Sequence, residues 1–166
     1  MQLLDELSFQ RMDMEKIDLK KELKSLYNPP TKEPVFVEIP ELNYLMVDGH
    51  GLPDGPDAVA AIEVLYPVAY TLKFTVKKEK AIDYGVMVLE GLWWSEDMND
   101  FLNSNKANWQ WTYMIMQPNF ITLSMVEKAI DEVRRKKNPA AIDKVTFKPL
   151  AEGKSAQIMH IGPYSA

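Results

Sequence analysis

The chain has 166 residues, of which 46% are hydrophobic and 26% charged, as in an ordinary folded protein of one compact domain or two small modules sharing a core. The formal net charge of −5 disfavours binding to nucleic acid, and the absence of cysteine excludes disulfides, thiolate metal sites and cysteine nucleophiles. Because no apolar run approaches the ~20 residues that cross a bilayer, and the N-terminus does not read as a secretory leader, we expect a soluble, cytoplasmic, bacterial-type protein with no membrane partner.

The first predicted element is an amphipathic helix over residues 14–27, in which a few apolar side chains recur near helical spacing among many charges: Ile17, Leu23 and Leu26. Pro29 and Pro30 follow it and end it, because proline cannot donate a backbone hydrogen bond and restricts the residue before it. We therefore expect residues 1–34 to form an N-terminal helix and linker, followed by one domain over residues 35–166.

Short strands are predicted over residues 35–39 and 44–47, on either side of Pro40. The Gly- and Pro-rich segment 49–57 is a turn that leads into a helix over residues 58–78. That helix reads AVAAIEVLYPVAYTLKFTVKK, and its internal proline should kink it.

Two further strands are predicted over residues 84–94 and 108–117, where the side chains alternate in character. The polar segment between them makes the pair a hairpin with a long loop. A helix over residues 122–137 follows, with Thr122 as its capping residue and an Asn-Pro pair directly after it.

The last predicted elements are strands over residues 145–150 and 155–161, joined as a hairpin around residues 152–153. The strands that end in MVDG (46–49) and MHIG (159–162) echo each other, since each runs into a turn with glycine and proline. A helix and two strands follow the first copy, whereas the sequence ends soon after the second. We therefore predict an α+β fold of tandem strand–helix–strand–strand modules with an antiparallel sheet, in which the second module is incomplete in this sequence.

All four tryptophans of the chain lie on the predicted hairpin. Period-two geometry places Trp109, Trp111 and Tyr113 on one face of its second strand. Such a face is either packed beneath a helix or open as a platform on which a flat ligand or a cation stacks. The candidate ligand walls are Trp93, Trp94, Trp109, Trp111 and Tyr113.

Glu90 interrupts an apolar row on the first strand of the hairpin, where it shares a face with Val86, Val88 and Leu92. If this side chain is partly buried, its pKa rises, and it acts as a general base or pairs with a ligand cation. The alternative is a glutamate at the rim of the sheet that meets solvent or a lysine. Glu90 is the candidate catalytic carboxylate.

The remaining residues with functional chemistry are few. His50 and His160 end the two echoing strands and are assigned to turns, because the sequence gives neither the partners of a catalytic triad nor those of a metal site. We expect no metal and no cofactor. Tyr164, near the C-terminus, is either a hydroxyl donor or a packed turn tyrosine.

Several motifs together resemble the GyrI-like small-molecule-binding proteins. They are EGLWW (90–94), NWQWTYMIMQPNFIT (108–122), HIGPYSA (160–166) and the opening MEKIDLKKELKSLYNPP, which looks like the start of stand-alone bacterial members. The resemblance implies two modules around a pseudo-two-fold cleft. Relatives serve as effector domains of multidrug-sensing regulators or inhibit DNA gyrase, and a similar branch hydrolyses the cyclopropane ring of DNA-alkylating toxins. In the family, HIGPY is followed by a helix and two strands with a key acidic residue, and this sequence ends before them.

Carried over to this sequence, the resemblance makes the aromatic residues of the hairpin the ligand walls. Hydrolysis of a strained cyclopropane needs an aromatic slot, a donor to the developing enolate oxygen and a carboxylate that orients water. Tyr113 or Tyr164 is the expected donor, and Glu90 the expected carboxylate. We expect a domain that binds planar, hydrophobic or cationic small molecules and hydrolyses cyclopropanoid genotoxins. The alternative is a non-catalytic multidrug sensor or sequestering module, or a gyrase-inhibitor-like protein-interaction domain.

Overall fold

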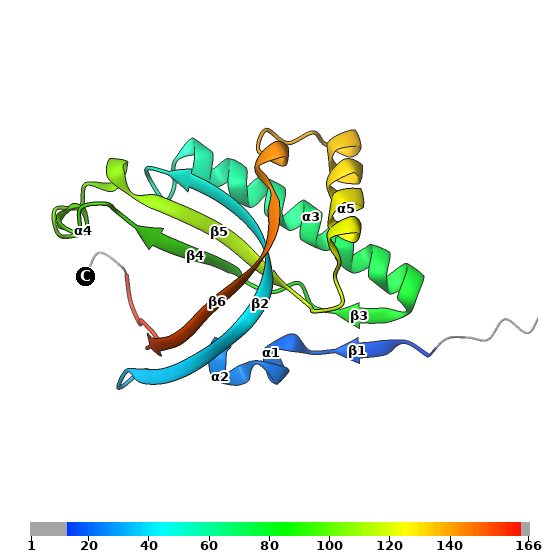
Figure 1. Ribbon diagram of the computed structural model, residues 1–166, viewed down its shortest axis with the longest axis horizontal. Helices are drawn as coiled ribbons and strands as arrows, with labels where there is room; N and C mark the ends of the chain where they lie inside the picture. Colours follow the sequence, from blue (N-terminus) through cyan, green and yellow to red (C-terminus); the bar gives the residue numbers. More distant parts are fainter. Residues whose placement is uncertain (1–12, 164–166) are drawn as a thin grey trace, which may run out of the picture.

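The computed structural model describes residues 13–163 and confirms the predicted α+β class. Its main sheet is antiparallel and curls into a half-barrel, with strands in the order β4-β5-β2-β6 (Figure 1). These strands are β2 (Val35–His50), β4 (Leu89–Trp94), β5 (Gln110–Gln117) and β6 (Thr146–Gln157). The pairing of β4 with β5 confirms the predicted hairpin.

The interior strand β2 is continuous through Pro40, so the prediction of two separate short strands is wrong. Near this proline, β2 pairs only with β6, and Ile39 lies opposite Gly153. The pairing of β2 with β5 begins only at Asn43. Proline, which has no N–H group to donate, is tolerated where one side of a strand has no neighbour.

β6 is likewise one strand, and the predicted hairpin around residues 152–153 is wrong. It pairs with β2 from Val35 to Met46. Gly153 has a φ of 65°, a left-handed value that glycine adopts without a steric penalty, so it fits inside the strand without starting a turn. The long ladder of hydrogen bonds to β2 therefore outweighs the local turn signal.

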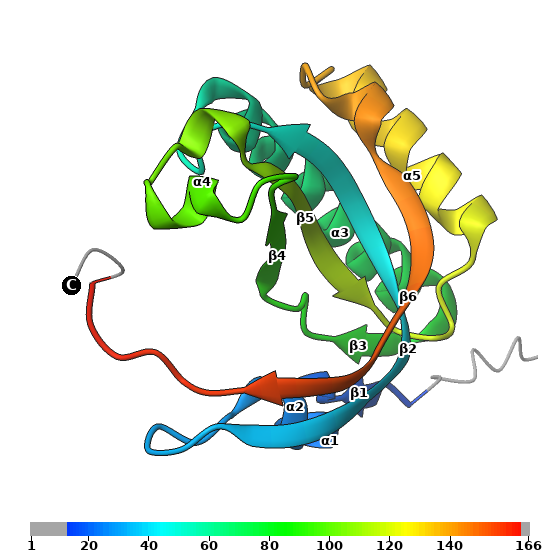
Figure 2. The same ribbon diagram turned by 60° about the vertical axis from the view of Figure 1, so that its left-hand side comes forward.

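Two long helices lie behind the sheet in Figure 2, and both confirm predicted helices: α3 (Pro56–Lys80) and α5 (Leu123–Lys136). Thr122 caps α5 as predicted, because its side chain accepts a hydrogen bond from the backbone N–H of Met125. α3 begins with proline in its first turn and continues through Pro67.

The core lies where α3 meets the sheet. Side chains at the centre of α3 are fully buried, as are Leu45 of β2 and Ile115 of β5. Among the described residues, α3 is the one helix long and apolar enough to cross a membrane, which by itself is weak evidence for a membrane span. Its buried residues instead pack within the molecule: Val64, Leu65, Val68, Leu72 and Val76.

The N-terminal segment is not the single helix predicted over residues 14–27. It forms strand β1 (Glu15–Ile17) and two short helices, α1 (Leu19–Glu22) and α2 (Lys24–Tyr27). β1 pairs in parallel with β3 (Ile82–Tyr84), the strand directly after α3. A single helix over this segment would have few apolar side chains to bury, so packing would stabilise it little. The backbone hydrogen bonds that β1 forms with the free edge of β3 are favoured instead.

The predicted strand over residues 84–94 is divided into two parts. Residues 85–88 have no regular structure and separate β3 from β4. The loop of the hairpin contains α4 (Asn99–Leu102) and a 3-10 turn, η1 (Lys106–Asn108). A second 3-10 turn, η2 (Ile142–Lys144), joins α5 to β6.

Candidate functional site

The two faces of the β4–β5 hairpin carry different side chains, because successive residues of a strand point to opposite sides. Trp93 of β4 pairs directly with Trp111 of β5, and these two share a face with Tyr113. Glu90 and Trp94 occupy the alternate positions of β4 and point to the other side. We call these the aromatic face and the Glu90 face.

The rings of the aromatic face pack closely against one another. The centroid of Trp93 lies 5.9 Å from that of Trp109, 6.5 Å from Trp111 and 5.6 Å from Tyr113. Phe101 of α4 adds a ring 4.7 Å from Trp109. Trp111 is only 1% exposed and Tyr113 8%. These two rings are therefore core, whereas Trp93, Trp109 and Phe101 are partly exposed.

Glycines make room for these rings. A Cβ atom at Gly49 of β2 would lie 2.2 Å from the Trp111 ring, and one at Gly91 would lie 2.9 Å from Nε1 of Trp93. The Nε1 atom of Trp111 is buried without a hydrogen-bond partner among the described residues. The indole rings can therefore approach the backbone this closely only because residues 49 and 91 are glycines.

The Tyr113 hydroxyl holds the loop that leads into α3. It donates a hydrogen bond to the carbonyl oxygen of Pro53 at 3.0 Å. Burial raises the pKa of Tyr113, and the negative charge of Asp54 raises it further. The Tyr113 hydroxyl thus keeps its proton, which already forms the hydrogen bond to Pro53.

The Glu90 face holds a largely buried carboxyl group between two tyrosines. The hydroxyl of Tyr27, from α2, donates a hydrogen bond to Oε1 of Glu90 at 2.7 Å, and Tyr44 of β2 lies beside both. Burial raises the pKa of Glu90; the hydrogen bond from Tyr27 opposes this rise, and the charge of Glu152 on β6 adds to it. Burial also raises the pKa of Tyr27 and of Tyr44, so both keep their protons.

This arrangement combines two kinds of group that proton-transfer chemistry requires. A carboxyl group with a raised pKa accepts a proton near neutral pH more readily than an ordinary glutamate does. A protonated hydroxyl beside it can donate to a developing negative oxygen. Trp94, 41% exposed, supplies an accessible indole on the same face.

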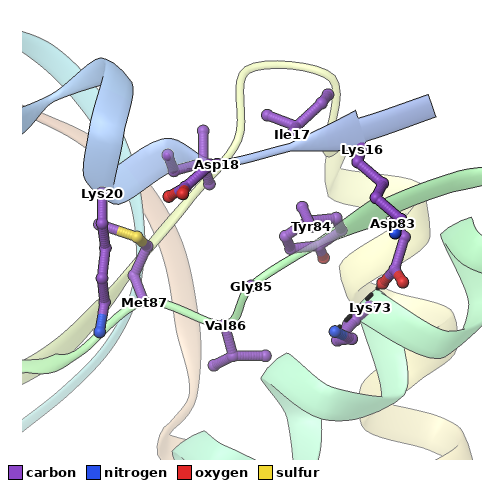
Figure 3. A pocket seen from close by; sticks show the side chains of 11 residues that line it. Lys16, Ile17, Asp18, Lys20, Lys73, Asp83, Tyr84, Gly85, Val86 and Met87 are labelled. Carbon is purple, nitrogen blue, oxygen red and sulfur yellow. Dashed lines mark ion pairs between the residues drawn. The ribbon is translucent and has the colours of Figure 1, made fainter.

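A separate pocket of about 510 Å³ lies between β1 and α1 on one side and β3 and α3 on the other (Figure 3). There the carboxylate of Asp83 accepts a hydrogen bond from Lys77 at 2.7 Å and lies 3.2 Å from Nζ of Lys73. These lysines lower the pKa of Asp83. The pocket contains none of the predicted site residues, and its central carboxylate is already paired, so it lies outside the candidate site.

The remaining candidates are the histidines and Tyr164. Within residues 13–163, no group of three His, Cys, Asp or Glu side chains could hold a metal ion. His160 lies in the segment after β6, where Nε2 is 3.4 Å from the carbonyl oxygen of Pro163. Tyr164 lies outside the described residues.

Comparison with known proteins relates the chain to three solved structures from Listeria innocua. An uncharacterized conserved protein is 38% identical, with a TM-score of 0.79, and the match covers 90% of this chain and 74% of that one. A hydrolase is 37% identical, with a TM-score of 0.76 and coverage of 90% and 76%. A hydrolase encoded by lin2189 is 39% identical, with a TM-score of 0.78 and coverage of 91% and 74%. The chain belongs to the family of these Listeria innocua proteins. No protein-family model matches it, and neither does any curated protein.

In this member of the Listeria innocua family, the predicted site residues fall into two groups. Trp94 and Glu90 lie on one face, and the other four ligand-wall candidates lie together on the opposite face: Trp93, Trp109, Trp111 and Tyr113. Tyr27 and Tyr44 were not among the predicted site residues. The period of β2 could have indicated Tyr44, but no local pattern brings Tyr27 to a glutamate 63 residues away.

Proposed function

We propose that the protein is a hydrolase that binds a planar, hydrophobic or cationic small molecule against the Glu90 face. The observation that carries this proposal is the largely buried Glu90 carboxyl group, 2.7 Å from the Tyr27 hydroxyl and on the same face as the accessible Trp94. The description of two relatives as hydrolases supports a hydrolytic reaction. The GyrI-like motifs support cyclopropanoid genotoxins as the substrates and protection of the cell as the role.

In the proposed reaction, ionised Glu90 takes a proton from a water molecule, and the water oxygen bonds to a cyclopropane carbon of the substrate. The ring C–C bond breaks, and its electron pair moves into the conjugated carbonyl group, whose oxygen becomes an enolate. As Glu90 becomes protonated, the hydroxyl of the partly exposed Tyr27 transfers its hydrogen bond from Oε1 of Glu90 to this developing oxygen. Return of the proton to the enolate completes the addition of one water molecule.

Tyr27 replaces Tyr113 as the expected donor to the substrate. Tyr113 points to the aromatic face, and its proton is already shared with Pro53. Tyr27 lies on the Glu90 face, 2.7 Å from the carboxyl group, and is partly exposed, so its hydroxyl can reach the substrate. Tyr44 lies beside both groups but is only 2% exposed, so it supports the Tyr27 side chain and does not contact the substrate.

A non-catalytic sensor or sequestering module is the second candidate, and it would use the same face. The observation that favours it is the presence of a second carboxyl group, Glu152, close enough for its charge to raise the pKa of Glu90. Negative charge on a partly apolar surface raises the local concentration of cationic ligands. This function requires the aromatic surface and the charge but no proton transfer.

Incubation of the purified protein with a cyclopropanoid alkylating agent, followed by mass spectrometry, distinguishes the two functions. A hydrolase converts many equivalents of the compound into a product that has gained one water molecule. A sensor or sequestering protein quenches tryptophan fluorescence stoichiometrically and returns the compound intact. Glu90→Gln should abolish turnover while preserving binding, and turnover should rise with pH through the raised pKa of Glu90.

Glu63→Gln is the matched control for that experiment. Glu63 is an exposed glutamate on α3, so the same chemical change there should leave turnover at the wild-type rate. Full turnover by Glu90→Gln would remove this carboxyl group from the mechanism. Recovery of the intact compound from the wild-type protein would exclude the hydrolase function for this substrate class.

A further inference from the structure

The outward side of α3 carries an exposed row of aromatic rings. Tyr66, Tyr70 and Phe74 recur every four residues and therefore share one helix face. Consecutive ring centroids lie 6.4 Å and 6.2 Å apart. Tyr70 is 46% exposed and Phe74 58%. A helix that covers a sheet ordinarily presents polar side chains to solvent. Here the solvent side is aromatic, and none of the described residues covers Tyr70 and Phe74.

The row borders a groove of about 1050 Å³ between α3 and α5 whose walls are basic. Six lysine or arginine side chains line it, against three carboxylates. Two of those carboxylates already pair with basic neighbours of the same helix. Lys78, Lys128 and Arg135 form no ion pair with the described residues. The groove therefore combines exposed aromatic rings with an excess of positive charge, on a chain whose net charge is −5.

The loop around α4 has the opposite character. Between Ser95 and Asn105 the chain has three carboxylates and no basic residue. Met98 and Leu102 lie one helical turn apart on this segment and are 69% and 83% exposed. The segment is thus a small acidic projection with an apolar tip: its carboxylates are Glu96, Asp97 and Asp100.

The two surfaces cannot meet within one molecule. α4 lies at one end of the half-barrel and α5 near the other, in both views of the molecule (Figure 1 and Figure 2). We propose that the α4 loop of one copy docks into the α3–α5 groove of a second copy. Met98 and Leu102 then cover Tyr70 and Phe74, and the acidic residues meet the basic walls of the groove.

The geometry determines the form of this association. Different surfaces of the two copies meet, so the contact is head to tail, and each added copy leaves one groove and one α4 loop free. One short helical segment in one groove buries far less surface than a stable interface of about 1,200–2,000 Å². The association should therefore be weak, dependent on protein concentration, and weakened by salt because its charges are exposed.

Sedimentation velocity over a range of protein concentrations tests the proposal. At low ionic strength, the average mass of the wild-type protein should rise with concentration, and high ionic strength should reverse the rise. Glu96→Lys changes only the α4 loop and Lys128→Glu only the groove, and each variant alone should stay monomeric. An equal mixture of the two should associate again, because the lysine introduced in one loop then meets the glutamate introduced in the other groove, and both unaltered surfaces remain available.

Glu127→Lys is the matched control, since it reverses a charge on α5 outside the groove and should associate like the wild type. Leu102→Ser should weaken association at every ionic strength, because it removes apolar contact without changing charge. Unfolding curves check that each variant is folded. A monomeric wild-type protein at every concentration and ionic strength overturns the proposal, and so does failure of the mixed variants to associate. Binding to anionic vesicles without self-association would also overturn it and would assign the groove to a lipid surface.

Discussion

Burial of the Glu90 side chain couples the stability of the fold to pH. Its folded pKa lies above the ordinary value of 4.5, so the folded state holds the proton more tightly than the unfolded chain does. The resulting stabilisation is fully present below pH 4.5 and is lost as the pH rises through the folded pKa. We predict that the free energy of unfolding, measured with urea, falls across this window and that Glu90→Gln removes this part of the slope.

The exposed Glu63 provides a control for that pH dependence. Glu63→Gln should leave the slope unchanged, because it makes the same chemical change at an exposed position and leaves the buried Glu90 carboxyl group intact. A wild-type slope that survives Glu90→Gln would mean that another group causes the pH dependence.

The hydrogen bond between Tyr27 and Glu90 yields a second prediction at the residue scale. Tyr27→Phe removes a donor 2.7 Å from the carboxyl group and should cost about 1–3 kcal/mol of stability. Because this hydrogen bond favours the ionised carboxylate, its loss should raise the pKa of Glu90 further. Urea unfolding measures the first effect, and NMR titration of the Glu90 side chain the second. An unchanged or lower pKa would contradict this account.

At the scale of the elements, β2 can pack against β5 as it does because Gly49 has no side chain to collide with Trp111. Gly49→Ala would place a Cβ atom 2.2 Å from the Trp111 ring, in a position where neither strand can move freely. We predict a loss of about 1–3 kcal/mol in stability, measured by thermal or urea unfolding. Gly85→Ala is the control, because a Cβ atom there meets nothing within 4 Å. Equal stability of the two variants would show that the indole ring relocates at little cost.

The tryptophans of the hairpin should separate into structural and binding residues. Trp111→Ala empties a site that is 1% exposed and should cost about 3–5 kcal/mol of stability. Trp94→Ala affects a ring that is 41% exposed, so it should change stability little but weaken ligand binding by about 1–3 kcal/mol if the ligand stacks there. Unfolding curves and fluorescence titrations measure the two quantities. If Trp111→Ala instead weakened ligand binding at little cost in stability, and Trp94→Ala lowered stability, the ligand site would lie on the aromatic face.

Elements with strong local signals could be predicted from the sequence. α5 has a capping Thr122 and an amphipathic pattern, and β5 alternates clearly, so both were recognised within a few residues of their bounds. β2 and β6 were each broken at a local turn signal, Pro40 in one case and Gly153 in the other. Long-range pairing between these two strands overrides both signals, and no sequence window contains that information.

For the molecule as a whole, local sequence patterns did not predict how the site residues divide between the two faces of the sheet. Strand periodicity correctly grouped Trp111 with Tyr113, because that relation is local. Glu90 was expected beside the aromatic walls, but the structure places it on the opposite face from most of them, together with Trp94 and the unforeseen Tyr27. Which face of the sheet a helix covers depends on the tertiary packing of the whole chain and not on any local sequence pattern.

The pairing of β2 with β6 also has a consequence for the time course of folding. Thr146 contacts Met46, 100 residues earlier in the chain, so the sheet is completed only after a long loop has closed. Such non-local pairing is typical of domains that fold in roughly milliseconds to seconds. During synthesis at about 5–20 residues per second, β2 emerges roughly 5–20 s before its partner. Throughout that interval one edge of an interior strand is unpaired, so β2 can pair with other chains until β6 is complete.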